Sequence, residues 1–330
     1  MKNGSIASIG EFGLIDIIKN QILNSKTEKN VTVGLGDDSF CFKLGKQSLC
    51  VTKDLLIENV HFKKEWIMPQ TLGQKAIEVN VSDIAAMGNV KPKYTFIGLG
   101  VPSTTSEIFI KNLYKGFKKI CDKYQILIAG GDTVRADKIV ISVTIIGVVC
   151  NDGIVKRSGA NAGDLIGITN TFGDAGGGVE LLCKYGKKHK YTKYERFLIS
   201  KQNSPKARLH EAWKISKYLT SLTDASDGLY VSIELLTKNF CKGADICIDK
   251  IPISTALKRV FKDSQKQLNF MLLGAEDYEL VFTVPASEAK ILKKLVPQIS
   301  YIGEVNLSNK VRYFYNGKEQ KIQYLGYKHF

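Results

Sequence analysis

Residues 72–88 read LGQKAIEVNVSDIAAMG, a helical pattern with a carboxylate on its apolar side. The pattern predicts a helix over residues 71–87 that ends at Gly88. Leu72, Ala76 and Val79 set one face, and Asp83 falls on it, seven residues after Ala76 and four after Val79. A buried carboxylate without a partner costs several kcal/mol, so Asp83 must face a partner or a metal ion. A buried salt bridge or a hydrogen bond between packed helices remains the alternative.

Further aspartates occur beside glycines or polar residues at places where we expect strands to end. The four segments are Gly36-Asp37-Asp38, Thr52-Lys53-Asp54, Gly130-Gly131-Asp132-Thr133 and Asp224-Ala225-Ser226-Asp227-Gly228. Any one of them could be ordinary turn chemistry, because aspartate and glycine are common turn residues. Carboxylates are also the hard oxygen ligands that Mg²⁺ takes, usually one or two per ion alongside water and phosphates. Together with Asp83, these segments predict a site for more than one Mg²⁺ ion.

Missing motifs exclude two large classes of phosphate-transfer protein. The chain has no G-x-x-x-x-G-K-[ST] loop and no H-R-D or D-F-G set. The glycine-rich residues 173–178 could bring backbone amides to a phosphate or let a helix pack closely, and we favour packing. Without a P-loop lysine, metal ions must neutralise the phosphate charge. The aspartates therefore indicate a Mg²⁺-dependent phosphotransferase that uses ATP.

Length, charge and cysteine usage place further bounds on the protein. The 330 residues suit two average domains, and the formal charge is +15. Because the lysines are spread along the chain, we favour a lysine-rich proteome and attraction of phosphate substrates over nucleic-acid binding. None of the seven cysteines forms a C-x-x-C pair, and we interpret them as reduced thiols. With no apolar span and no signal peptide, we expect a cytoplasmic protein without nucleic-acid or membrane partners.

The order of predicted elements favours an α+β fold with two domains, residues 1–150 and 151–330. Residues 12–22 predict a helix, and Thr104-x-x-Glu107 predicts a capping box for another. Strands are predicted at 48–52, 93–101, 126–129 and 139–149. A turn at residues 151–153 marks the domain boundary. Beyond it we expect a strand at 164–169, helices after 178, near 205–219 and up to about 240, and strands over 303–324.

With these motifs in place, the chain resembles the thiamine-monophosphate kinases, relatives of aminoimidazole-ribonucleotide synthetase and selenophosphate synthetase. The resemblance covers essentially the whole chain. Its motifs, in order, are Gly10-Glu11-Phe12, GLGDDS (34–39), DLLIENVHF (54–62), NVSDIAAMG (80–88), GGDT (130–133), RSGANAGD (157–164), ASDGL (225–229), GAEDYEL (274–280) and GYKHF (326–330). The VHF element and the final GYKHF separate this family from its relatives. Selenophosphate synthetase would need a reactive cysteine near the N-terminus, and none precedes Cys41.

The resemblance implies transfer of phosphate from ATP to thiamine monophosphate, which gives thiamine diphosphate and ADP. It implies a homodimer whose N-terminal mixed sheets form a shared barrel, with an α/β sandwich-like C-terminal domain completing the site. Its Mg²⁺ ligands match Asp38, Thr52, Asp54, Asp83, Asp132, Asp224 and Asp227. Its ATP contacts match Gly131, Asp132, Arg157 and Ser226. Its contacts to the thiamine phosphate match His61, Glu276 and Tyr324. No residue is expected to act as a general base.

Lys53 departs from the family pattern, which usually has a small hydroxyl residue before the aspartate at position 54. In a strand, Thr52 and Asp54 would share one face and Lys53 would point the other way, which leaves the ligands intact. If the backbone bends, the ammonium could contact phosphate or replace part of a metal charge. The alternative functions are another ATP-using synthetase of the same superfamily and a basic nucleic-acid-binding protein.

Overall fold

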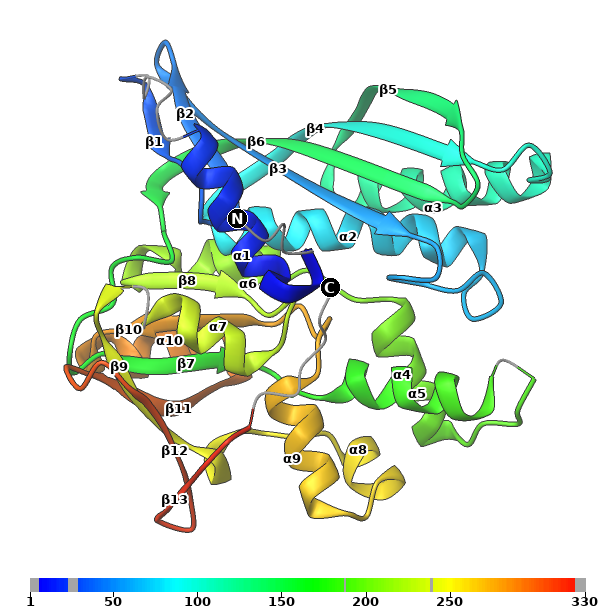
Figure 1. The fold of residues 1–330 in the computed structure, drawn as a ribbon. Helices are drawn as coiled ribbons and strands as arrows, with labels where there is room; N and C mark the ends of the chain where they lie inside the picture. The colour runs from blue at the N-terminus through cyan, green and yellow to red at the C-terminus, as the bar shows by residue number, and fades with distance from the viewer. Residues whose placement is uncertain (1–5, 23–28, 187, 238–239, 324–330) are drawn as a thin grey trace.

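Two β-sheets with associated helices form the molecule, and a long helix lies between them (Figure 1). The computed structural model describes residues 6–22, 29–186, 188–237 and 240–323. The predicted α+β class is confirmed. Within these ranges, no helix has both the length and the apolar character needed to cross a bilayer.

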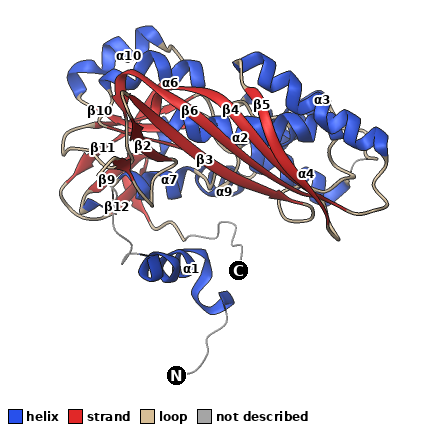
Figure 2. Ribbon diagram, turned by 90° about the horizontal axis from the view of Figure 1, so that it is seen from above, coloured by secondary structure: helices blue, strands red, loops and turns tan. Residues whose placement is uncertain are grey.

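The first sheet is antiparallel except between β4 and β5, and its strands follow the order β1-β2-β3-β6-β4-β5. Its strands are β1 (Val31–Val33), β2 (Phe40–Leu44), β3 (Gln47–Ile57), β4 (Gly88–Val101), β5 (Leu127–Arg135) and β6 (Val140–Ile154). Helices α2 (Pro69–Ala86) and α3 (Glu107–Tyr124) pack side by side against one face of this sheet (Figures 1 and 2). Residues 151–153 continue strand β6, so the predicted turn there is wrong.

The second sheet has the order β13-β12-β9-β11-β7-β10-β8. Its strands are β7 (Leu165–Thr169), β8 (Ser221–Asp224), β9 (Gly243–Cys247), β10 (Leu280–Val284), β11 (Ile299–Asn306), β12 (Val311–Tyr315) and β13 (Lys318–Gln320). The helices of this half are α4 (Asp174–Tyr185), α5 (Lys193–Asn203), α6 (Leu209–Ile215), α7 (Leu229–Leu236), α8 (Thr255–Val260), α9 (Ser264–Leu273) and α10 (Ala289–Leu295). The strands and helices expected in this half are therefore present.

Helix α2 joins the two halves. Pro69 begins it, at the first helical turn where a missing N–H costs nothing. The helix contacts β3, β4 and β6 of the first sheet, β8 of the second and helix α6. Leu72, Ala76 and Val79 are buried, as the periodicity predicts. A polar side chain on α2 can therefore reach either sheet.

Helix α3 begins two residues later than the predicted capping box. Ser106 is its N-cap and accepts a hydrogen bond from the Phe109 amide at 3.2 Å. Glu107 is instead the first helical residue and pairs with Lys111 four residues on. The box starting at Thr104 is wrong because a nearer hydroxyl residue takes the cap.

Helix α1 (Ile6–Ile22) confirms the N-terminal helix. Gly10 interrupts it with φ +65, a conformation that glycine adopts without steric cost. Ile15, Ile18 and Ile22, which set the predicted apolar face, are exposed.

Two cysteines are paired. Cys41 on β2 lies directly opposite Cys50 on β3, and the structure joins them by a disulfide. The interpretation of all seven cysteines as reduced thiols is wrong for this pair. Antiparallel register brings together residues that no C-x-x-C spacing marks. The free cysteines within the described ranges are Cys121, Cys150, Cys183, Cys241 and Cys247.

Candidate active site

Three aspartates from separate elements meet between the two halves. Asp38 precedes β2, Asp83 lies on α2 and Asp224 ends β8, and each offers a carboxylate oxygen within 4.8 Å of the other two. The prediction that Asp83 faces a partner or a metal ion is confirmed for a partner, because the Thr52 hydroxyl donates to it. Asp224 closes its strand as expected. The spacing of the three aspartates in the sequence does not predict that they lie close together, because their proximity depends on α2 lying between the sheets.

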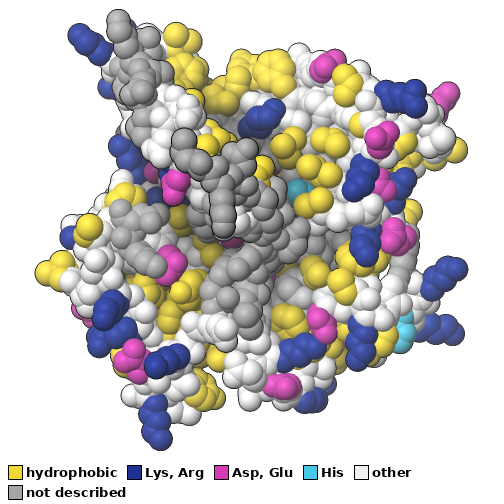
Figure 3. All heavy atoms as spheres, viewed as in Figure 1, with side chains coloured by type: hydrophobic (Ala, Val, Ile, Leu, Met, Phe, Trp, Pro, Cys, Tyr) yellow, Lys and Arg dark blue, Asp and Glu magenta, His cyan; other side chains and the backbone are white. Residues whose placement is uncertain are grey.

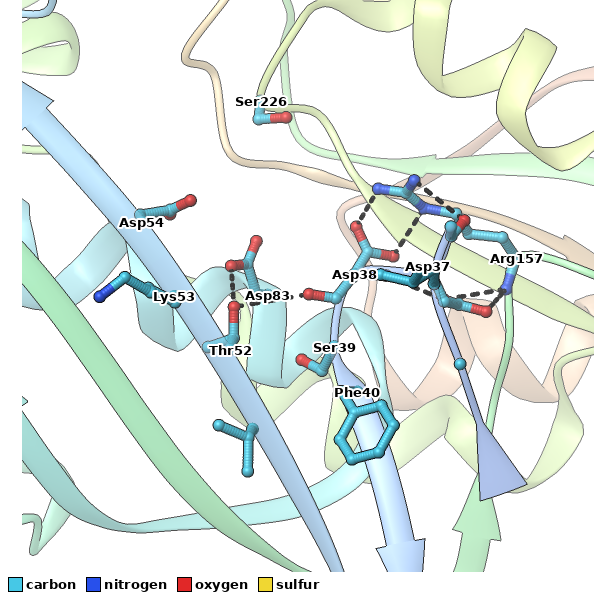
Figure 4. A pocket seen from close by; sticks show the side chains of 14 residues that line it. Asp37, Asp38, Ser39, Phe40, Thr52, Lys53, Asp54, Asp83, Arg157 and Ser226 are labelled. Atoms are coloured by element: carbon cyan, nitrogen blue, oxygen red, sulfur yellow. Dashed lines mark hydrogen bonds and ion pairs between the residues drawn. The ribbon is translucent and has the colours of Figure 1, made fainter. Parts of the chain in front are cut away.

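Hydroxyl groups hold these carboxylates in place. Thr52 on β3 donates to Asp83, and Ser82 on α2 donates to Asp224 at 2.5 Å (Figure 4 shows the Thr52 contact). Thr223 donates to Asp38 at 3.2 Å. Asp83 and Asp224 each accept a hydrogen bond from one of these hydroxyls and keep lone pairs for another partner.

A cavity of about 300 Å³ opens beside the three aspartates. Its walls come from the segment before β2, from β3, from Asp83 and from the start of the second half. The lining residues are Gly34, Leu35, Gly36, Asp37, Asp38, Ser39, Phe40, Val51, Thr52, Lys53, Asp54, Asp83, Arg157 and Ser226 (Figure 4). The predicted ligands Asp38, Thr52, Asp54 and Asp83 thus share one cavity with the predicted ATP contacts Arg157 and Ser226.

The electrostatics of the cavity favour a cation. Burial, and then the charges of neighbouring aspartates, raise the pKa of Asp54, Asp83 and Asp224 above the ordinary carboxyl value. The charge of Asp227 contributes to the raised pKa of Asp54. Carboxylates that lie this close to one another do not all ionise unless a cation binds beside them. Hard oxygen donors with free lone pairs are the set that Mg²⁺ takes, so these residues fit the metal that the sequence implies.

Arg157 supplies part of that positive charge in the structure. Its Nη2 lies 2.6 Å and its Nε 3.1 Å from the two oxygens of Asp38. The Arg157 backbone amide also donates to the Asp37 carboxylate at 3.2 Å. The Asp38–Arg157 pair therefore joins a predicted metal ligand to a predicted nucleotide contact.

The metal-free protein is expected to lose stability as the pH rises. Folding raises the pKa of Asp54 from 3.8 to about 6 and that of Asp224 from 3.8 to about 8. The folded state then binds more protons than the unfolded state across this window, so the free energy of unfolding falls between about pH 4 and pH 8.

Mg²⁺ should remove this loss by pairing with the ionised carboxylates. At 100 times its dissociation constant it should add about 2.7 kcal/mol, which corresponds to a rise of about 4 °C in Tm for a chain of this length. The rise should be larger at pH 8 than at pH 5, and thermal melts in EDTA and in Mg²⁺ measure it. Equal metal-free melting temperatures at pH 5 and pH 8 would contradict the prediction.

Lys53 points away from the carboxylates, as a regular strand requires. Its Nζ donates to Ser142 Oγ on the neighbouring strand β6 at 2.7 Å, while Thr52 faces Asp83 (Figure 4). Of the two alternatives left open for Lys53, the structure has the regular strand, with Thr52 bonded to Asp83 and Asp54 lining the cavity. The ammonium is exposed on the opposite face of the sheet.

Other predicted site residues lie outside this cavity or the described ranges. Asp54, which does line the cavity, and Asp132 lie within strands β3 and β5, so the expectation that both end strands is wrong. Gly131 and Asp132 are exposed on β5 and do not line the cavity. His61 accepts a hydrogen bond from the Ile57 amide, and Glu276 pairs with Lys75. Asp227 is exposed, and Tyr324 lies outside the described residues.

The glycine-rich residues 173–178 have a structural role. The amides of Gly173 and Ala175, at the start of α4, donate to Asp277 at 2.6 and 3.1 Å. A side chain at Gly178 would meet the Leu198 carbonyl of α5 at 2.4 Å. The close-packing interpretation is confirmed, because a carboxylate already occupies the amides that a phosphate would need.

Some polar residues around the site were missed by the sequence interpretation. Ser82 and Lys75 lie seven residues apart on α2 and therefore share one helical face, and this spacing is a signal that could have been used. Gln202, which contacts Glu276, carries no such local signal.

Similarity to known proteins indicates a broad class for this chain. Residues 36–149, which contain Asp38, Asp54 and Asp83, match the family model described as AIR synthase related protein, N-terminal domain. Hydrogenase maturation protein HypE of Escherichia coli shares the fold alone, with a TM-score of 0.68 at 18% identity over 95% of this chain and 97% of that chain.

Whole-length relatives then identify the family. The thiamine-monophosphate kinase of Aquifex aeolicus is 34% identical over 98% of this chain and 99% of its own, and that of Bacillus subtilis is 32% identical over 97% and 99%. A solved structure described as AaThiL complexed with AMPPCP and TMP superposes with a TM-score of 0.87, at 33% identity and full coverage of both chains. This chain belongs to the thiamine-monophosphate kinase family.

Proposed function

We propose that this protein transfers the γ-phosphoryl group of ATP to thiamine monophosphate, which completes the synthesis of thiamine diphosphate. The observation that carries the proposal is the meeting of Asp38, Asp83 and Asp224 beside Arg157 and Ser226. It is supported by the full-length similarity to a solved relative described as complexed with AMPPCP and TMP.

Several Mg²⁺ ions are part of this proposal. Asp38, Asp83 and Asp224 would hold one at their meeting point, and Thr52 and Asp54 line the same cavity. Asp132 and Asp227 complete the proposed ligand set. Bound Mg²⁺ would neutralise phosphate charge and hold the reacting groups in line.

The chain's own groups then position the two anionic substrates. Arg157, Ser226, Gly131 and Asp132 are assigned to ATP. The guanidinium of Arg157 presents a planar fork suited to phosphate oxygens. The acceptor's phosphate is already ionised at neutral pH, so no residue needs to remove a proton. Catalysis rests on placing the two groups in line and offsetting their repulsion.

The acceptor site is assigned to His61, Glu276 and Tyr324. Glu276 is held close to the nucleotide residues, because its amide donates to the Ser226 carbonyl at 2.6 Å. An aromatic ring at position 324 would stack on the flat rings of thiamine, an attraction worth about 0.5–2 kcal/mol.

A homodimer is proposed on the open face of the first sheet. Outward-facing apolar side chains are exposed there, whereas the opposite face packs on α2 and α3. They are Leu55, Tyr94, Phe96, Leu127 and Val134. Exposed apolar groups on one sheet face are typical of an interaction surface. A second copy would cover it and form the shared barrel.

Residues 1–150 are proposed as the nucleotide and dimerisation domain and residues 151–330 as the domain that completes the site. A cytoplasmic location, where ATP is supplied, is part of the proposal. On the face shown in Figure 3, Lys and Arg side chains are scattered among acidic ones. The charge of +15 is assigned to attraction of phosphate substrates instead of nucleic-acid binding.

The direct test mixes the protein with ATP, Mg²⁺ and thiamine monophosphate and resolves the products. Thiamine diphosphate and ADP in equal amounts are expected, and omission of Mg²⁺ should remove both. ADP with inorganic phosphate and no thiamine diphosphate would defeat the proposal and favour a synthetase with another acceptor.

Transfer should proceed with inversion at phosphorus. The acceptor attacks directly, and no histidine or cysteine is among the described residues that line the cavity. ATP made chiral at the γ-phosphate should therefore give thiamine diphosphate of inverted configuration. Net retention would require a phosphorylated enzyme, for example on one of the aspartates, and would exclude direct transfer.

A further inference from the structure

Lys75 is a buried cation outside the aspartate cavity. Its side chain is 1% exposed, and its Nζ lies 3.0 Å from each oxygen of Glu276 and 3.1 Å from the Gln202 carbonyl. The lysine therefore pairs with the proposed acceptor-binding carboxylate from within the core. A charge buried in this way must be paired to be tolerated, so Lys75 and Glu276 fix each other's position.

Gln202, on helix α5, completes this cluster. Its side-chain Nε2 donates to Glu276 Oε2. The reverse orientation of the amide would set its oxygen against the carboxylate, so the amide orientation follows from the charge of Glu276. Gln202 is 7% exposed, and no described residue donates a hydrogen bond to its Oε1. A buried acceptor left without a donor destabilises the folded protein.

The backbone holds this cluster against the active site. The amides of Glu276 and Tyr278 donate to the carbonyls of Ser226 and Ala225, at 2.6 and 3.0 Å. Glu276 and Tyr278 have φ +67 and +51, unusual values for residues other than glycine. Such conformations are strained for residues with a side chain and cluster at functional sites. Ser226 borders the aspartate cavity, so Glu276 stands at its margin.

The charges around Glu276 indicate which part of the acceptor binds there. Lys75 already neutralises Glu276, so a second cation gains little at this position. The remaining groups are carboxylate lone pairs and the Gln202 oxygen, which all accept hydrogen bonds. Thiamine monophosphate has a cationic thiazolium ring and a neutral pyrimidine with an exocyclic amine. Two adjacent acceptors match the two N–H groups of that amine.

We propose that Gln202 determines acceptor specificity, with its Oε1 accepting an N–H of the aminopyrimidine amine beside Glu276, and that Lys75 is a positioning residue for Glu276. This inference rests on the proposed function. It adds a side chain of helix α5 to the acceptor site and assigns the aminopyrimidine, instead of the thiazolium, to Glu276.

The test compares two acceptors with wild-type protein and the variant Gln202→Leu. The second acceptor is the analogue whose exocyclic amine is replaced by an oxo group, which would set an oxygen against Gln202 Oε1. Wild-type protein should prefer the amine by about 100-fold or more in kcat/KM, because a site built to bind an N–H leaves its acceptors unpaired with the analogue. Gln202→Leu should reduce that preference about 10-fold or more, a change of about 1.4 kcal/mol. Its KM for ATP should stay unchanged.

The matched control is Gln265→Leu, an exposed glutamine on α9 that should leave the preference unchanged. If Gln202→Leu does not fold, Gln202→Met is the second variant, because its unbranched side chain keeps the shape. Equal use of both acceptors by wild-type protein would overturn the inference without any variant. An unchanged preference in a folded Gln202 variant would also overturn it. Absence of any phosphorylated thiamine product would instead defeat the proposed function.

The role of Lys75 is tested by comparing how one substitution changes KM for thiamine monophosphate and KM for ATP. Lys75→Met should raise KM for thiamine monophosphate about 10-fold and leave KM for ATP within twofold, because only Glu276 loses its partner. The double variant Lys75→Met/Glu276→Gln should regain thermal stability, since no unpaired charge remains, without regaining acceptor affinity. A proportional rise of both constants would make Lys75 a purely structural residue.

Discussion

Asp83→Asn is expected to lower kcat by about 100-fold or more while the protein stays folded. Asp83 meets Asp38 and Asp224 within 4.8 Å. Loss of one charged ligand should remove several kcal/mol of charge stabilisation in the transition state, and each 1.36 kcal/mol is about tenfold in rate. Steady-state kinetics with saturating ATP and thiamine monophosphate measure the change.

Stability separates this role from a structural one. Burial and the charges of its neighbours raise the pKa of Asp83, so a neutral amide should relieve repulsion. In EDTA the variant should melt no lower than wild type, and its rise in Tm on addition of Mg²⁺ should be smaller. Asp122→Asn is the matched control, because Asp122 is an exposed helical aspartate paired with Lys118. Near-normal turnover, or simple unfolding, would return Asp83 to a structural role.

Local pattern was sufficient to predict most of the fold. The helix expected at residues 71–87 is Pro69–Ala86, because apolar periodicity and flanking signals act within a few residues. Boundaries failed where two local signals competed, as at Ser106, or where strand pairing continued past a turn signal, as at residues 151–153.

In the site too, the features set by local sequence could be predicted and those set by long-range packing could not. Asp83 could be predicted because its helical face is a local property. The Asp38–Arg157 pair and the Ser82–Asp224 hydrogen bond join residues 119 and 142 positions apart, and only the placement of α2 between the sheets creates them. The Cys41–Cys50 pair likewise depends on strand register. Long-range packing decides such contacts, and no spacing in the sequence records it.

Substitution of Arg157 should also have a large effect, because Arg157 is expected to pair with Asp38 in the absence of metal and with ATP in its presence. Without metal its guanidinium holds both oxygens of Asp38, which also faces Asp83 and Asp224. The proposed reaction needs those oxygens for Mg²⁺ and the guanidinium for ATP. Mg²⁺ binding should therefore release Arg157 from Asp38 and free its planar fork for phosphate.

Arg157→Met should accordingly have opposite outcomes for stability and activity when Mg²⁺ is added. In EDTA the variant leaves Asp38 unpaired, and the free energy of unfolding should fall by about 2–4 kcal/mol. Saturating Mg²⁺ replaces the lost positive charge and should restore the melting temperature. Activity should stay about 100- to 1,000-fold low, since no other donor takes the place of the guanidinium at the phosphate. Arg157→Lys keeps the charge without the planar fork, so its activity should lie between those of wild type and Arg157→Met. If Mg²⁺ fails to restore stability, Asp38 does not ligate the metal. If activity recovers with stability, Arg157 serves only to hold Asp38.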